Sequence, residues 1–194
     1  MRIGIGIDGD GPLEAVLPRF KQAEEEGFAS AWMPNIFGYD AIMMMALAGA
    51  VTSRIELGTF VVPTYPRHPT AIAQQALTAS AATGNRFALG IGLSHKIVIE
   101  NMFGLDYSKP IRHTREYLSV LMPLLQGKPV GFQGEEYRVN AAIAVPAQPP
   151  QVLVAALGPQ MLKLAGRLAD GTATWMGGPK YLAESAIPTI RAAA

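Results

Sequence analysis

The chain has 194 residues, of which 49% are hydrophobic and 16% charged, a composition that suits one sizeable folded core and argues against disorder. Lysine and arginine (16) nearly balance aspartate and glutamate (15), so no basic surface predicts binding to nucleic acid or to an anionic membrane. The lack of cysteine excludes disulfides, thiolate zinc sites and cysteine nucleophiles. We therefore expect the partner to be a small molecule or another subunit.

The chain opens on "RIGIGID", residues 2 to 8, which has the pattern of a buried strand and lacks the features of a signal peptide. Its longest apolar stretch, between Asp40 and Arg54, is too short to span a bilayer. We expect a cytoplasmic protein without a transmembrane segment.

Hydrophobic periodicity predicts a strand at 2–8 followed by a helix at 12–28 that ends near Gly27. The same pattern of a short apolar run before an amphipathic segment recurs five more times, which gives six strand-helix units. The later strands and helices are expected at 30–35 and 38–53, 55–63 and 68–83, 86–95 and 111–127, 151–157 and 158–171, and 172–177 and 178–194.

An interruption separates the fourth and fifth units. Residues 128–150 carry Gly131, Gly134 and several prolines around short alternating pieces, a pattern typical of a hairpin and a loop. Nothing in this segment suggests a second core, so we expect one domain over residues 1–194.

Continuous apolar strands that alternate with helices predict an α/β protein with a parallel sheet covered by helices. A dinucleotide-binding Rossmann domain would need a third glycine three residues after Gly92, but that position is His95. Polar and glycine residues instead follow many different strands, which favours a (β/α)8 barrel with its site at the carboxyl ends of the strands.

A complete barrel needs eight units and about 250 residues. Six units leave the first and last strands with unpaired edges. We therefore expect the chain to be an incomplete barrel, a fragment of a longer protein. The alternative is a reduced barrel that a partner chain completes.

The stretch "RFALGIGLSHK" holds the first candidate site residues. Gly90 and Gly92 lack side chains and could let a flat ligand or a phosphate approach the strand end. Ser94 could bind a phosphate, and the imidazole of His95 could donate or accept a proton near neutral pH. The alternative is a serine that caps a helix beside a solvated histidine.

Two other junctions place a glycine before a proline at the start of a helix, Gly158 with Pro159 and Gly178 with Pro179. The free N–H groups of such helix starts could hold a phosphate at the barrel mouth, or they could be ordinary turns. Trp175 lies at the end of the sixth strand, where it could stack on a planar cofactor.

Other residues have a structural assignment as the first expectation. His68 is expected at a helix entry, and Trp32 and the run "IMMM" at 42–45 are expected in the core. The alternative for Trp32 and for a methionine of the run is contact with a planar cofactor ring. His113 and Arg115 are expected on a solvated helix face, with contact to a pocket as the alternative. No Glu or His pair has the spacing of metal ligands, so we propose no metal site.

Six segments in this order resemble the bacterial luciferase-like monooxygenase superfamily, and most closely its branch of oxidoreductases that depend on the deazaflavin coenzyme F420. The segments are "RIGIGIDGDG", "GFASAWMPNIFGYDA", "IELGTFVVPTYPRHP", "ALGIGLSHK", "RHTREYLSVLMPLLQG" and "VLVAALGPQMLKLAGRLADGTATWMGGP". The resemblance covers essentially the whole chain. Since members of the family have a complete barrel, it implies that two C-terminal units are missing here.

The resemblance also implies roles for individual residues. It implies a cis peptide bond between Phe60 and Val61 beneath the flavin-like ring, and a hydrogen-bonding role for Asn35 and Thr59. Sugar oxidation is not expected, because the Asp-His pair found after the second strand of deazaflavin sugar dehydrogenases is replaced by Pro34 and Asn35. The implied catalytic residues are His95, as acid or base, and Asn35; the implied cofactor-binding residues are Thr59, Phe60, Val61, Gly92, Ser94, His95, Ala156, Gly158, Pro159, Trp175, Gly177 and Gly178.

The implied activity is hydride transfer between reduced coenzyme F420 and a small organic substrate. An FMN-dependent monooxygenase of the same superfamily is the first alternative, and a flavin-binding protein without catalysis is the second. A scaffold that dimerises without any cofactor is the third. By analogy with the family we expect a homodimer.

Overall fold

The computed structural model describes residues 2–194 and contains a parallel sheet with the strand order β1-β2-β3-β5-β8-β9. The strands of this path are β1 (Gly4–Gly6), β2 (Ser30–Met33), β3 (Glu56–Thr59), β5 (Phe87–Gly92), β8 (Gln151–Ala155) and β9 (Gly171–Ala173). Every pair along the path is parallel. A short seventh strand, β4 (Val62–Pro63), pairs with β5 beyond the end of β3, so β3 and β4 act as one strand interrupted at Phe60 and Val61.

Helices follow the strands as the periodicity predicts. They are α1 (Leu13–Glu25), α2 (Ala41–Val51), α3 (Pro69–Ala82), α4 (Pro110–Leu125), α5 (Pro159–Leu168), α6 (Pro179–Tyr181) and α7 (Ile187–Arg191), with π-helical turns η1 (Val98–Met102) and η2 (Leu182–Ala186). The last predicted helix is thus three short pieces, α6, η2 and α7. The six predicted strand-helix units are confirmed.

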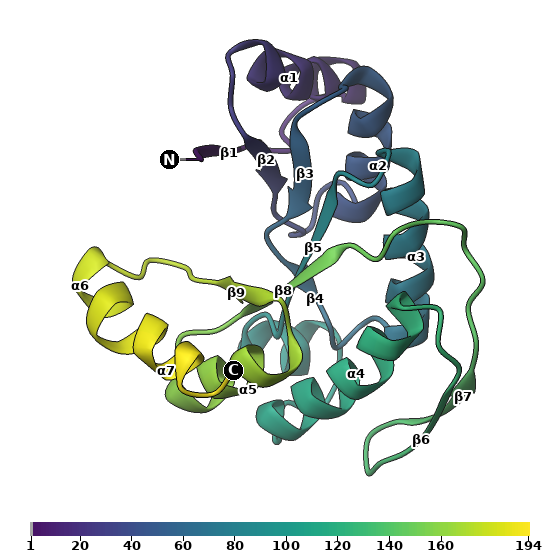
Figure 1. Cartoon of the computed structure of the whole chain (residues 1–194), viewed down its shortest axis with the longest axis vertical. Coiled ribbons are helices and arrows are strands. Elements are labelled where there is room, and N and C mark those ends of the chain that lie inside the picture. Colours follow the sequence, from purple (N-terminus) through teal and green to yellow (C-terminus); the bar gives the residue numbers. More distant parts are fainter. Residues whose placement is uncertain (1) are drawn as a thin grey trace.

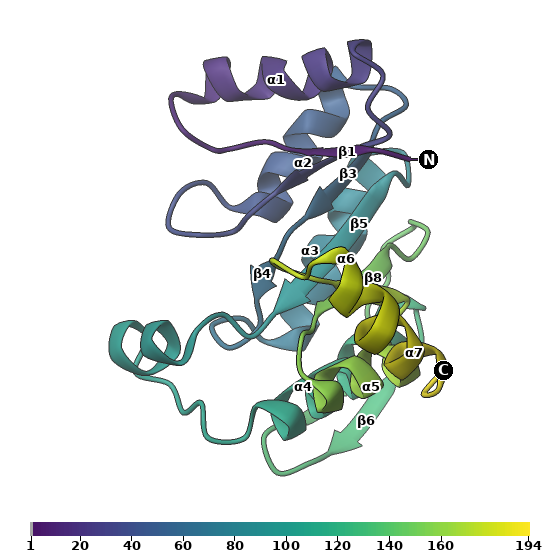
Figure 2. The same cartoon turned by 90° about the vertical axis from the view of Figure 1, so that its left-hand side faces the viewer.

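The sheet curls into half a barrel. In Figure 1 it bends from β1 and β2 at the top to β8 and β9 below, with α1 to α5 around its outer side. Figure 2 shows the same layers from the side, with the segment around η1 projecting beyond the strand ends. The strand order runs in sequence and has no reversal of direction, which confirms the barrel type over the Rossmann alternative.

The predicted hairpin lies in the interruption between the fourth and fifth units. Strand β6 (Val130–Gln133) pairs antiparallel with β7 (Arg138–Ala141), and the two form a separate sheet beside α4. The hairpin therefore adds a feature to the outside of the half barrel without contributing to its main sheet.

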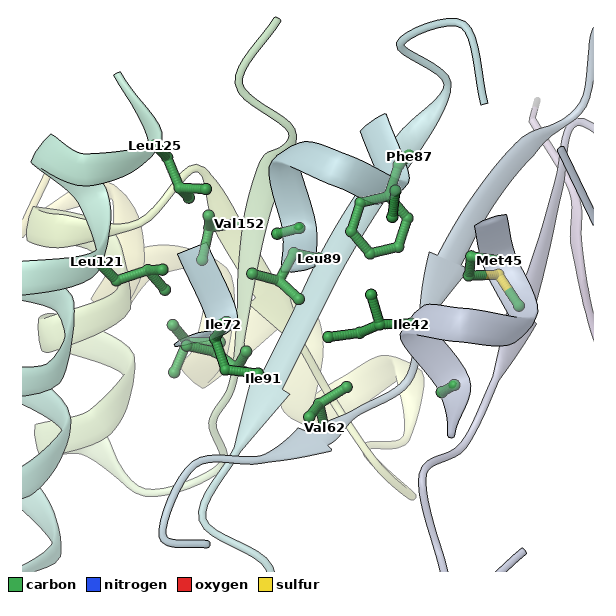
Figure 3. Packing of buried hydrophobic residues seen from close by; sticks show 14 of the residues in the cluster. Ile42, Met45, Val62, Ile72, Phe87, Leu89, Ile91, Leu121, Leu125 and Val152 are labelled. Atoms are coloured by element: carbon green, nitrogen blue, oxygen red, sulfur yellow. The ribbon is translucent and has the colours of Figure 1, made fainter. Parts of the chain in front are cut away.

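One face of the sheet makes the core with the helices. Leu89 and Ile91 of β5 and Val152 of β8 are buried against Ile72 of α3 and Leu121 of α4 (Figure 3). Alternate residues of the same strands point to the concave face, where β5 presents Ala88, Gly90 and Gly92. The apolar strands are thus buried on their outer side, and β5 carries small residues on its inner side.

Several structural assignments can be checked. Met44, Met45 and Ile42 are buried as expected, whereas Met43 is 66% exposed. His68 caps α3, where its Nδ1 accepts a hydrogen bond from the N–H of Thr70, which confirms the helix-entry prediction.

The expectation that Trp32 lies in the core is wrong. Its strand neighbours Ala31 and Met33 face the helices, so Trp32 points to the concave face and is only half-buried. There its ring covers Gly58, at which an added Cβ would lie 2.2 Å from the indole. Within residues 2–194 we find no helix with the length and apolar character needed to cross a membrane.

Candidate active site

The carboxyl ends of five neighbouring strands form one continuous rim. Met33 of β2 pairs with Thr59 of β3, and Ile91 of β5 pairs with Val154 of β8. Beyond them, β8 pairs with β9 up to its last residue, Ala173. Because the strands are parallel and in register, the segments that follow them lie side by side. The structure therefore brings the predicted site segments to one edge, which we call the carboxyl rim.

The segment after β3 contains the cis peptide bond between Phe60 and Val61, as the family resemblance implies. Thr59 is completely buried, and its hydroxyl donates to the carbonyl of Gly90 at 2.8 Å while accepting from the Gly90 N–H at 2.9 Å. A hydrogen bond from Thr59 to a ligand would require this link between β3 and β5 to break. The cofactor-binding roles of Thr59, Phe60 and Val61 stay predictions.

Gly90 and Gly92 serve a packing purpose that was not expected from the sequence. A Cβ on Gly90 would lie 2.0 Å from the carbonyl oxygen of Thr59, and a Cβ on Gly92 would lie 2.7 Å from Cγ2 of Val61. The Cβ positions of both glycines are filled by the interrupted strand β3–β4, so close packing between β5 and this strand requires glycine at both places. Approach of a ligand to this strand end, and contact between the Gly92 backbone and a cofactor, stay predictions.

The segment after β5 turns sharply at Ser94, whose φ of 61° lies in the left-handed region. His95 follows with an exposed side chain, and its carbonyl accepts the N–H groups of Val98 and Ile99 at the next helical turn. The imidazole of His95 is thus accessible at the rim, beside the end of β5.

The segment after β2 holds Asn35 firmly by one end. Its side-chain oxygen accepts the N–H of Ala41 at 3.0 Å and a guanidinium N–H of Arg67 at 3.3 Å. Arg67 is fixed in turn by an ion pair of 2.6 Å with Asp40, which caps α2 through the N–H of Met43. Because the acceptor atom is engaged, Asn35 can offer a ligand its amide N–H groups.

The ends of β8 and β9 carry the two predicted glycine-proline helix starts. Gly158 caps α5 with Pro159 in its first turn, and Gly178 caps α6 with Pro179 in the same place. The two junctions differ, since α5 continues for ten residues and α6 for three. The Tyr181 hydroxyl donates to the Leu157 carbonyl and so ties the second junction to the first.

The remaining predicted site residues differ in their exposure. Trp175 is 70% exposed at the end of β9, whereas Ala156 is 4% exposed and belongs to the core. Gly177 lies against Tyr181 and Leu182. The cofactor-binding roles of these residues and of Gly178 stay predictions.

With this geometry in place, comparison with known proteins decides the family. The family model described as luciferase-like monooxygenase matches residues 1–194. The chain belongs to this family.

Two relatives of this luciferase-like protein are reductases. A 5,10-methylenetetrahydromethanopterin reductase of Archaeoglobus fulgidus is 31% identical over 183 residues, which cover 93% of the chain and 54% of the relative. The coenzyme F420-dependent tetrahydromethanopterin reductase from Methanopyrus kandleri superposes with a TM-score of 0.85 at 28% identity, covering 99% of the chain and 61% of that protein. The chain thus spans about half the length of the relative from Archaeoglobus fulgidus.

A third comparison shows the fold alone. The oxygenating constituent of 3,6-diketocamphane monooxygenase from Pseudomonas putida, a type II Baeyer-Villiger monooxygenase in complex with FMN, has a TM-score of 0.80 at 16% identity. It covers 100% of the chain and 64% of that protein. The luciferase-like half barrel is therefore common to an F420-dependent reductase and to a monooxygenase in complex with FMN.

The luciferase-like chain also has a second polar cluster, which lies around His113. His113 is 3% exposed and lines a pocket, so its expected place on a solvated helix face is wrong and the alternative of pocket contact is confirmed, whereas Arg115 is exposed as predicted. The His113 ring stacks on Tyr65 with centroids 3.8 Å apart and planes at 7°. Burial lowers the pKa of His113 to about 4, so its imidazole is neutral at pH 7.

Helical spacing was the signal that could have found His113. It lies four residues before Tyr117 and eight before Leu121, both of which are fully buried on α4. A depression of about 350 Å³ adjoins the cluster between the start of α4 and the turn of the β6–β7 hairpin. Burial also raises the pKa of Tyr65 and of Glu136, which line this depression.

Proposed function

We propose that the protein is an oxidoreductase that binds coenzyme F420 at the carboxyl rim and transfers a hydride between it and a small organic substrate. The observation that carries this proposal is the continuity of the rim, which collects segments from β2, β3, β5, β8 and β9 at one edge. The 31% identity to a methylenetetrahydromethanopterin reductase supports this assignment.

The rim residues fit the flat ring of such a coenzyme. Val61 lies against Gly92, and an added Cβ on Gly92 would also come within 3.0 Å of the Ala155 Cβ. These residues come from three neighbouring strand segments, and Phe60, Val61 and Ala155 are partly exposed. Together they offer an apolar surface on which a planar ring can lie.

The start of α5 fits the anionic tail. Gly158, Pro159 and Gln160 are exposed, and the first N–H groups of an α-helix have no partner within the helix. Such a terminus favours phosphate through these N–H groups and the helix dipole. We assign the phosphate to this ten-residue helix, with the end of β9 beside it.

Bound at this rim, the coenzyme would supply a two-electron hydride at its ring carbon. The protein supplies orientation and the proton. Asn35 would donate its amide N–H groups to the ring or the substrate, because its oxygen is held by Ala41 and Arg67. His95 is accessible at the end of β5 and would donate or accept the proton that accompanies hydride transfer.

FMN is the alternative cofactor, favoured by the likeness in fold to an FMN-containing monooxygenase. Both cofactors present a planar ring and a phosphate, so the same rim would receive either. A flavin-binding protein without turnover is the further alternative.

Titration of the full chain with coenzyme F420 and, separately, with FMN tests the proposal. We expect F420 to bind with quenching of its fluorescence and to exchange a hydride with a substrate in single turnover. Binding of FMN alone, with its two-band absorption spectrum, would favour the monooxygenase. Binding of F420 without turnover against any tested carbonyl, alcohol or imine would favour the non-catalytic alternative, and binding of neither would overturn the proposal.

We also propose a homodimer, with α2 at the interface. Helix α2 has the sequence AIMMMALAGAV without a charged residue, although it lies on the outside of the half barrel. Met43, Leu47 and Val51 are exposed by 66, 42 and 40% at a spacing of four residues, which makes one apolar stripe. A helix that is apolar all round is expected to be covered, and a second copy presents the same stripe in return.

Sedimentation of the full chain tests this interface. We expect twice the mass of one chain for the wild type and a single chain mass for Leu47→Lys. The matched control is Ala15→Lys on the exposed face of α1, which should stay dimeric. A wild-type chain that sediments as a monomer would contradict the proposal.

A further inference from the structure

His113 uses every polar atom of its ring to join three parts of the molecule. Its Nε2 lies 2.9 Å from the hydroxyl of Thr64, and its Nδ1 lies 3.1 Å from a carboxylate oxygen of Glu136. The ring face stacks on Tyr65, which stacks in turn on Tyr107 with centroids 5.2 Å apart. Thus α4 contacts the segment after β4, the hairpin turn and the segment after β5 through one side chain and its stack.

Protonation fixes the direction of these hydrogen bonds. Because the pKa of His113 lies near 4, the neutral imidazole carries one proton at pH 7. An ionised Glu136 can only accept, so Nδ1 donates to it and Nε2 accepts the hydroxyl proton of Thr64. All polar atoms of the buried ring are then satisfied.

The hairpin end of this chain of contacts is firmly held. Glu116, also buried on α4, accepts the N–H groups of Glu135, Glu136 and Tyr137 at 2.9 to 3.1 Å. Arg112 pairs with Glu135 and Glu136. The carboxylate that orients His113 is therefore fixed to α4 through the backbone of its own turn.

The other end of the chain of contacts reaches the carboxyl rim. Thr64 is 2% exposed, and its N–H donates to the Gly92 carbonyl at 2.9 Å. Only the two residues of β4 separate Thr64 from Val61, and both pair with Ile91 and Gly92 of β5. A displacement of Thr64 would thus move Val61 against Gly92, the surface assigned above to the coenzyme ring.

We propose that His113 is a positioning residue for the ring seat, acting through Thr64 on Val61 and Gly92; this inference rests on the proposed function. His113 itself lies beside the site and contacts neither the ring nor the substrate. The stack of His113 on Tyr65 and its hydrogen bond to Thr64 hold the interrupted strand β3–β4 in the position in which Val61 can support the coenzyme ring.

The experiment separates positioning from general stability with three threonine variants of the full chain. Thr64→Val removes the hydroxyl that His113 accepts, and Thr64→Ser keeps it. Thr114→Val is the matched control, since Thr114 is equally buried on α4 but donates only to the Pro110 carbonyl of its own helix. His113→Phe is a fourth variant that keeps an aromatic ring against Tyr65 without the two nitrogens.

Two readouts are measured: amide hydrogen exchange over residues 59–66 and 90–95 without coenzyme, and the Kd for coenzyme F420 by fluorescence. We expect Thr64→Val and His113→Phe to speed exchange in both segments and to raise Kd about tenfold, whereas Thr64→Ser and Thr114→Val stay within about twofold of wild type.

Three other results have distinct meanings. Unchanged exchange in Thr64→Val and His113→Phe would overturn the positioning role, whatever the coenzyme affinity. Faster exchange with an unchanged Kd would also overturn it, because the strand end would move without effect on the ring. If the wild type bound no F420, the proposed function would fail, and the positioning of a ring seat would fail with it even if exchange increased.

Discussion

The two ends of the parallel strands use polar side chains in opposite ways. At the amino ends, Glu24 accepts the N–H groups of Ser53, Arg54 and Ile55. Arg86 donates to carbonyls of Gly49, Thr52 and Ile55 in the same stretch. At the carboxyl ends, in contrast, the side chains of His95 and Trp175 are exposed.

The difference shows where this fold places stability and where it leaves groups for a ligand. We call the amino ends of the strands the amino rim. Its polar side chains form hydrogen bonds with the backbone between α2 and β3, so their role is to stabilise the fold. Groups at the carboxyl rim are held in place by their own backbone and by neighbouring side chains, as Asn35 is held by Arg67. Their atoms that face away from these neighbours stay accessible. This division agrees with barrels in general, which carry sites at the carboxyl ends of the strands.

The largest effect is expected at the amino rim. Arg86→Met should lower the free energy of unfolding by about 3 kcal/mol, because buried carbonyls between α2 and β3 lose their donor. Urea denaturation measures it, with the exposed Arg115→Met as the control. Coenzyme affinity should stay within about twofold of wild type, since no contact at the carboxyl rim changes. A large loss of coenzyme affinity without a loss of stability would contradict the division of roles between the two rims.

The opposite pattern is expected for His95→Ala. The turnover of a confirmed substrate should fall about 100-fold, as for the loss of a general acid or base. The free energy of unfolding should change by less than about 0.5 kcal/mol, because the side chain is exposed. Steady-state kinetics and urea denaturation on the same preparation measure both. Unchanged turnover would show that His95 does not transfer the proton.

Glu24→Gln should lower the free energy of unfolding by about 2 kcal/mol at pH 7. Desolvation raises the pKa of Glu24, but hydrogen bonds from the N–H groups of Ser53, Arg54 and Ile55 and from the Ser53 hydroxyl together outweigh it. They lower this pKa to about 2 from its ordinary value of 4.5. The stabilisation from a lowered carboxylate pKa is complete above pH 4.5 and is lost as the pH falls toward 2.

Denaturation of the wild type and of Glu24→Gln at pH 7, 4 and 3 tests this sign. The difference in unfolding free energy should shrink between pH 4 and pH 3. A difference that stays constant over this range would mean that the Glu24 carboxylate is not stabilised by the segment before β3.

The smallest expected effect concerns the independence of the two rims. The double variant with Arg86→Met and His95→Ala should lose stability and turnover by the sums of the single effects, within about 0.5 kcal/mol. Urea denaturation and kinetics on all four proteins measure the coupling. A larger coupling would show that the rims share a conformational change.

Much of the fold was predictable because its signals are local. Six apolar runs before amphipathic helices predicted the parallel sheet, and glycine and proline around 128–150 predicted the hairpin. The helix entries at His68, Pro159 and Pro179 followed from the fixed φ of proline and from capping chemistry.

The misjudged residues depend on contacts between distant segments. His113 is buried because Thr64, Tyr65 and Glu136 reach it from two other parts of the chain. Gly90 is required by the carbonyl of Thr59, 31 residues earlier. Helical spacing indicates that the His113 side chain is buried, but no local pattern names the partners of His113 or of Gly90. The strand ends were therefore predictable, and the contacts that explain the residues on them were not.

Hydrogen exchange of the full chain with and without coenzyme F420 tests the central claim most directly, because it locates the bound coenzyme without requiring a substrate. The account predicts that F420 slows exchange at the carboxyl rim, over residues 59–64, 92–96, 156–162 and 174–180, and leaves residues 49–56 and 84–87 unchanged. Slower exchange confined to the amino rim, or no change at saturating F420, would contradict it.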